Sequence, residues 1–131
     1  MAIREDLITQ ITAKLSGHSA YSISSELPYS SGDQLLYEKN MRTVYVDEQQ
    51  DDITDLYPTL DSQDVKQRLT TVNAYLVTDA KNQTSDINTV LANILAAANG
   101  ITGKAQNDAL VTTDIVADTI TYTFEYNFIT I

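Results

Sequence analysis

The last segment of the chain has the strictest hydrophobic period in the sequence. Between residues 119 and 128, every second position is apolar or aromatic: Ile120, Tyr122, Phe124, Tyr126 and Phe128. The positions between them hold threonines, Glu125 and Asn127. Because successive side chains of a strand point to opposite faces of a sheet, this alternation predicts a long strand with one apolar face and one solvated face. The polar face is expected to point away from the helices of the fold.

Other segments also have the composition of strands. Residues 41–48, Met-Arg-Thr-Val-Tyr-Val-Asp-Glu, are rich in β-branched and aromatic residues. Residues 65–77 place apolar side chains on both alternating sets of positions, which favours a central strand with both faces partly buried. A shorter strand is predicted over residues 110–116, and a weak one over residues 21–27.

Two segments have helical spacing instead. The apolar positions of residues 3–15 fall on one helical face: Ile3, Leu7, Ile8, Ile11 and Leu15. A second stripe runs from Ile87 to Ala98, and Thr84 or Ser85 is predicted to cap that helix.

The order of these elements predicts the fold class. A chain of 131 residues is expected to make one domain, residues 1–131. Helices and mostly antiparallel strands occupy separate stretches, which is typical of α+β proteins. We therefore predict a single-domain α+β sandwich, with a four- or five-stranded sheet and two helices packed on one face.

An acidic stretch interrupts this pattern between residues 47 and 64. It contains no Lys or Arg and holds these acids: Asp47, Glu48, Asp51, Asp52, Asp55, Asp61 and Asp64. A charge run of this kind is most often solvated, and we predict a long exposed loop. A calcium site is disfavoured because the segment lacks the alternating acids and central glycine of a calcium-binding loop.

The overall composition disfavours most chemistry. The formal charge of −10 opposes binding to phosphate backbones and anionic membranes, and no apolar run approaches the ~20 residues of a membrane span. The absence of cysteine excludes thiolate chemistry, and His18, the single histidine, follows Gly17 in what is predicted to be a solvated turn. Gly100 and Gly103 do not have P-loop spacing. We predict a soluble cytoplasmic protein that is not an enzyme and has no catalytic residues, cofactor or metal site.

Tyrosine is more frequent than a core of this size requires, with 8 in the chain. Tyr122 and Tyr126 alternate with Phe124 and are predicted to be core residues. Tyr29, Tyr37 and Tyr57 have loop contexts, and tyrosine suits contact surfaces, so these three are candidate subunit or partner contacts.

The chain resembles the tail terminator proteins of long-tailed, lambda-like bacteriophages. The likeness rests on the leading helix, Arg-Thr-Val-Tyr-Val-Asp-Glu at 42–48, the acidic excursion and Leu-Thr-Thr-Val-Asn-Ala-Tyr-Leu-Val at 69–77. It continues through the helix at 86–98 and the strand at 118–128, so it spans nearly the whole chain.

The resemblance implies a structural virion protein of the tail and neck, assembled in the host cytoplasm. Such a protein forms a homo-hexameric ring on the tail tube, ends tube polymerisation and presents a surface to the head connector. DNA passes through the ring without specific binding, and Asp51, Asp52, Asp55 and Asp61 are candidate channel or interface residues. The alternatives are a head-closure or head–tail joining protein, another structural tail subunit, or a small-molecule binding module.

Overall fold

A computed structural model describes residues 3–29, 40–57, 65–101, 104–105, 110–116 and 118–130. In chain order its elements are α1 (Ile3–Lys14), β1 (Ser22–Ser24), β2 (Thr43–Val46), β3 (Gln50–Tyr57), β4 (Val65–Asp79), α3 (Ile87–Ala96), the 3-10 helix η1 (Ala97–Gly100), β5 (Lys104–Ala105), β6 (Leu110–Val116) and β7 (Thr119–Thr130). The strands form one mixed sheet.

The centre of the sheet is a long antiparallel pair, β4 with β7. Their register runs from Arg68 opposite Thr130 to Asp79 opposite Thr119. On the far side of β4, β3 pairs with the first half of that strand and β2 with the second half. On the far side of β7, β6 pairs with its first half and β5 near its end. Only β1, parallel to β2, departs from the antiparallel pattern among the described strands.

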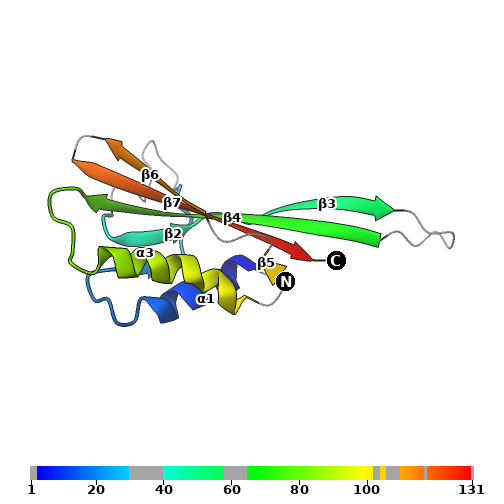
Figure 1. The fold of residues 1–131 in the computed structure, drawn as a ribbon, viewed down its shortest axis with the longest axis horizontal. Coiled ribbons are helices and arrows are strands. Elements are labelled where there is room, and N and C mark those ends of the chain that lie inside the picture. The colour runs from blue at the N-terminus through cyan, green and yellow to red at the C-terminus, as the bar shows by residue number, and fades with distance from the viewer. Residues whose placement is uncertain are drawn as a thin grey trace.

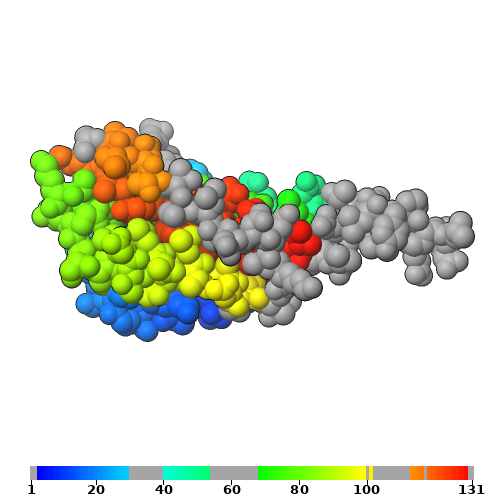
Figure 2. All heavy atoms as spheres, in the orientation of Figure 1, coloured from blue at the N-terminus to red at the C-terminus, as the bar shows by residue number. Residues whose placement is uncertain are grey.

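The core lies between one face of this sheet and the helices α1 and α3, which lie together on that face (Figure 1). The helices contribute Leu7, Ile11, Val90 and Ile94, all fully buried. The sheet contributes the even-numbered positions of its strands: Val44, Val46, Val72, Ala74, Leu76, Tyr122, Phe124, Tyr126 and Phe128. In the space-filling view, α1 and α3 gather along one side of the body and the atoms of β6 and β7 along the other (Figure 2).

The predicted α+β fold class is confirmed, as is the mostly antiparallel sheet with helices on one face. The sheet has seven strands among the described residues, more than the predicted four or five. The weak strand predicted over residues 21–27 forms as β1, which is 3 residues long. The strands that were not predicted are β3, which lies in the predicted loop, and β5, which with only 2 residues carries little periodicity. The long strands β4, β6 and β7 lie where the sequence predicts them.

Two local predictions need correction. The exposed loop predicted over residues 47–64 is wrong for residues 50–57, which form β3, while residues 58–64 lie outside the described residues. The N-cap position of the second helix is Asp86 rather than Thr84 or Ser85. The Asp86 side chain occupies this position without making a capping hydrogen bond.

Candidate assembly surface

Part of the sheet extends beyond the helices. We call this part the β3–β4 arm: residues 50–57 of β3 and residues 65–71 of β4. Its backbone pairs run from Gln50 opposite Thr71 to Tyr57 opposite Val65, with an irregularity before Tyr57. The arm projects past the end of α1 (Figure 1). Residues 68–71 of β4 also pair with β7, so among the described strands only residues 54–57 and 65–67 form a ribbon of two strands. Such a ribbon is marginally stable in water, so this end of the arm is a natural surface for another protein chain.

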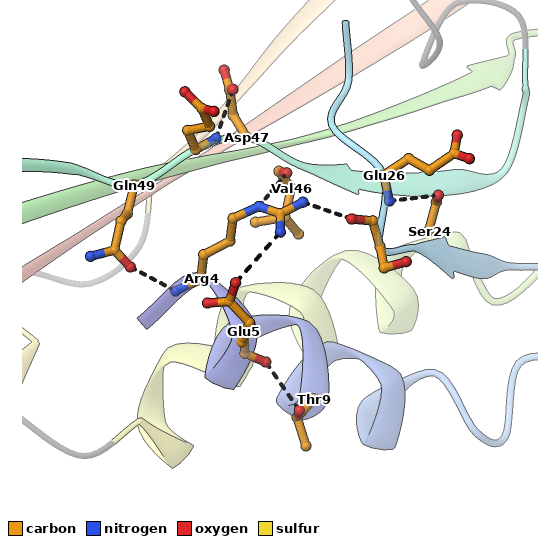
Figure 3. Close-up of polar contacts among 10 residues, drawn as sticks. Arg4, Glu5, Thr9, Ser24, Glu26, Val46, Asp47 and Gln49 are labelled. Atoms are coloured by element: carbon orange, nitrogen blue, oxygen red, sulfur yellow. Dashed lines mark hydrogen bonds and ion pairs between the residues drawn. The ribbon is translucent and has the colours of Figure 1, made fainter. Parts of the chain in front are cut away.

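The base of the arm is tied to the first turn of α1 by Arg4 (Figure 3). The Arg4 backbone N–H donates a 3.1 Å hydrogen bond to Oε1 of Gln49, directly before β3. The Arg4 side chain donates from Nε to the carbonyl of Val46 at 3.1 Å and from Nη2 to the carbonyl of Ser25 at 2.9 Å. One residue therefore joins α1 to the segments that follow β1 and β2.

Asp51 continues this network into the arm. Its carboxylate accepts a 2.5 Å hydrogen bond from the Thr70 hydroxyl and a 3.1 Å hydrogen bond from Nε2 of Gln49. The hydrogen bond from Thr70, followed by that from Gln49, lowers the pKa of Asp51 below its ordinary value. Thr70 is almost completely buried, so Asp51 satisfies a hydroxyl at the margin of the core. This residue acts in the architecture of the arm.

Of the four acids predicted to act together, Asp51 and Asp52 do not share one face of the sheet. Asp51 and Asp52 are consecutive strand residues, so their side chains point to opposite faces of the sheet. Asp55 pairs through its backbone with Lys66, and Asp61 lies outside the described residues. Asp51 and Asp52 therefore cannot line one face of the sheet together, and a channel or interface role for any of the four acids stays a prediction.

A different set of acids shares the helix-free face. Asp52 stands opposite Leu69, and Asp114 of β6 stands opposite Thr121. Glu125 lies four residues after Thr121 on β7, so the two side chains point to the same face of the sheet. All three acids therefore belong to the face that points away from the helices. All three are exposed. The sequence already predicted that Glu125 lies on the polar face of its strand. That Asp52 and Asp114 lie on the same face is known only from the registers of β3 and β6.

The tyrosines predicted to be contact residues lie in different environments. The Tyr29 ring, 49% exposed, packs edge-on against Tyr75 of β4, with a centroid distance of 6.4 Å and an interplanar angle of 69°. Part of its contact surface is thus used within the chain. Tyr57 is the last residue of β3, and Tyr37 lies outside the described residues. Tyr122 and Tyr126 are buried, as predicted.

His18 corrects another prediction, because its side chain is only 14% exposed rather than solvated. Its Nδ1 lies 2.7 Å from Oδ2 of Asp86, and its Nε2 lies 3.1 Å from Nδ2 of Asn93. The Asn93 amide group donates also to the Lys14 carbonyl, so Nε2 of His18 accepts and Nδ1 donates. Hydrogen bonds from Thr84 and then His18 lower the pKa of Asp86. The cluster links the end of α1 to the start of α3.

Within the ranges given above, no group of three or more His, Cys, Asp or Glu side chains could hold a metal ion. No described helix has the length and apolar character needed to cross a membrane.

Four described strands have one unpaired edge: the short strands β1 and β5, and the two longer strands β3 and β6. β3 pairs with β4 and β6 pairs with β7, and no other described strand covers their outer edges. Both edges carry exposed apolar side chains, with Ile53 56% exposed, Ile115 65% and Val116 62%. Unpaired edges with exposed isoleucine and valine are templates for pairing with another chain.

Comparison with known proteins adds no family assignment. No model of a known protein family matches the chain, and no curated protein matches its sequence.

Proposed function

We propose that this chain is a structural virion protein of a long-tailed phage. It caps the tail tube as a homo-hexameric ring, ends tube polymerisation and joins the tail to the head connector. The observation that carries the proposal is that two of the longer strands, β3 and β6, have no partner among the described strands on their outer edges, which lie on opposite sides of the central β4–β7 pair. A chain with two different free edges can bind copies of itself head to tail, and such contacts form a ring where the rotation between successive copies closes.

The proposal also assigns the helix-free face to the DNA channel. Asp52, Asp114 and Glu125 give this face exposed carboxylates from three strands. The chain as a whole carries −10, so a ring multiplies negative charge around its bore. Because the phosphate backbone is repelled by such a wall, DNA passes without finding a binding site.

The first experiment tests termination of the tail tube. Purified tube protein is polymerised with and without this protein, and tube lengths and tube ends are recorded by electron microscopy. We expect shorter tubes whose ends carry a ring of this protein. Tubes of unchanged length with bare ends contradict the proposal.

The same material separates the terminator from a head-closure or joining protein. A terminator binds the tube protein in the absence of the connector, whereas a joining protein binds the purified connector and leaves tube length unchanged. Binding to neither component, with a monomer that binds a small molecule, favours the binding-module alternative.

A charge-reversal variant tests the channel. In the triple variant Asp52→Lys, Asp114→Lys and Glu125→Lys, the bore acquires phosphate attraction. Gel shifts should reveal DNA binding that weakens as salt rises, and virions built with the variant should eject DNA more slowly. Asp51 is left unchanged because it accepts the Thr70 hydroxyl.

The matched control carries the same change in net charge at three positions outside β3, β6 and β7. Its substitutions are Glu5→Lys, Asp6→Lys and Glu26→Lys, at three exposed positions. DNA affinity and ejection that change equally in both variants show a general charge effect and place the bore elsewhere.

A further inference from the structure

We propose that β3 of one copy pairs antiparallel with β6 of the next copy, with Ile53 directly opposite Ile115. This inference rests on the proposed ring and names the contact that closes it. The partner is therefore a second copy of this chain, bound through backbone hydrogen bonds at its sheet edge.

The first support is the composition of the two edge strands, in which aspartate is the only charged residue. The eight residues of β3 and the seven of β6 contain neither lysine nor proline, the residues that commonly guard edge strands. The two strands are also nearly equal in length. β3 and β6 belong to one sheet but lie at opposite ends of the molecule, with β3 in the arm and β6 at the other end (Figure 1). Each copy thus offers one edge to each of two neighbours.

The second support is strand direction. β3 is antiparallel to β4, β4 to β7, and β7 to β6. It follows that β3 and β6 run in opposite directions within the sheet. When a second copy continues the sheet in the same orientation, its β3 meets β6 as an antiparallel neighbour. The new pair therefore has the same geometry as most pairs inside the subunit.

The third support is that the two isoleucines share a face. Ile53 stands opposite Arg68, an even-numbered position of β4, and those positions face the helices. Ile115 stands opposite Ile120, which packs against the same core. A continued sheet can pair only residues on the same face, so registers that differ by an odd number are excluded. Ile53 opposite Ile115 satisfies this requirement.

Charge and strand length then disfavour the two neighbouring registers on the same face. With Ile53 opposite Ile115, Asp52 meets Val116 and Asp114 meets Thr54, so no two of these acids are opposed. A shift of two residues in one direction places Asp52 directly opposite Asp114, and like charges at such positions are destabilising. A shift in the other direction carries Ile53 past Val116, the last residue of β6. The chosen register also buries the two exposed isoleucines against each other.

A disulfide experiment tests this contact because the chain contains no cysteine. Directly opposed residues of an antiparallel pair have Cα atoms about 4.5–5.5 Å apart, within the range that a disulfide spans. The double variant Ile53→Cys with Ile115→Cys is assembled on tail tubes, oxidised and analysed on non-reducing gels. We expect a reducible ladder of covalent oligomers that ends at the closed ring.

The matched control is Ile53→Cys with Thr113→Cys, which keeps the same face but moves one cysteine by two residues. Diagonal neighbours are about 7–8 Å apart, so its ladder should be weaker by about tenfold. The single variant Ile115→Cys tests symmetric pairing of β6 with β6, which yields covalent dimers only. Melting temperatures before oxidation identify any variant that fails to fold. If a cysteine variant does not fold, Ile115→Lys is used instead, because Ile115 is exposed. We then expect that tube ends no longer carry rings of this protein.

The outcomes separate this contact from the function. Rings at tube ends without the Ile53–Ile115 ladder, or with a stronger ladder in the control, overturn the pairing and leave the terminator proposal standing. Dimers from Ile115→Cys alone overturn it in favour of symmetric pairing. Wild-type tubes without rings overturn the function itself. For the lysine variant, unchanged ring occupancy overturns the contact.

Discussion

The hydroxyl of Tyr126 donates a 2.6 Å hydrogen bond to the backbone carbonyl of Ile94, inside the core. This bond joins β7 directly to α3 and satisfies a phenol that is completely buried. The Ile94 carbonyl also accepts the backbone N–H of Ala97 at the end of the helix. The relationship explains how a strand rich in tyrosine can supply a core face without leaving its polar atoms unpaired.

Replacing this tyrosine tests the value of the bond. Tyr126→Phe should lower the free energy of unfolding by about 1 kcal/mol, because the carbonyl keeps one of its two partners. Urea melts at neutral pH measure the change. Unaltered stability would show that the bond contributes nothing to the fold.

Tyr126 is also expected to make the fold less stable at alkaline pH. Burial raises the pKa of Tyr126 above the value of about 10 that it has in the unfolded chain. The stability linked to its protonated form is therefore complete below pH ~10 and decreases as the pH rises further. Melts between pH 8 and 11 should show a steeper decline for the parent than for Tyr126→Phe. Parallel curves contradict this assignment.

The two faces of β7 give a second stability test. Phe124 is fully buried among core residues, so Phe124→Ala should cost about 3–5 kcal/mol. Thr123 lies on the helix-free face, and Thr123→Ala should change stability by less than about 1 kcal/mol. Equal losses in denaturant melts would mean that both faces of this strand are packed.

Asp51 predicts a pH effect at the acid end. Hydrogen bonds from Thr70 and Gln49 hold the pKa of Asp51 below its unfolded value, so their stabilisation is complete above pH ~4 and is lost as the pH falls. Asp51→Asn should flatten the acid limb of a stability profile between pH 2 and 6. Asp52→Asn removes the same charge from the neighbouring exposed position and serves as the control. A larger effect at Asp52 would contradict the network.

The His18 cluster can be tested by truncation. His18→Ala removes the hydrogen bonds to Asp86 and Asn93 and should lower the free energy of unfolding by about 1 kcal/mol or more. The adjacent exposed position provides the control, since Ser19→Ala should change it by less than about 0.5 kcal/mol. If the two variants melt together, the cluster does not hold α1 to α3.

Short-range patterns account for most of the elements that the sequence predicts correctly. The alternation of β7 and the helical stripe of α1 reflect burial of one face, and that pattern is written in consecutive residues. The acidic strand β3 has no such signature, since aspartate is depleted in strands. Asp51 and Asp52 lie in a strand because β4 offers them a paired backbone, and the identity of that partner is a long-range property.

The features of the candidate site likewise fall into those that the sequence predicts and those that require the tertiary structure. The sequence by itself determined the fold class, the net charge of −10 and the polar character of one face of the last strand. Only the tertiary structure decided that Asp51 and Asp52 point apart and that Asp52 joins Asp114 and Glu125 on one face. It also decided that no other described strand pairs with the outer edges of β3 and β6. The physical reason is that facing direction follows from strand register, and register is set by contacts between segments distant in the chain.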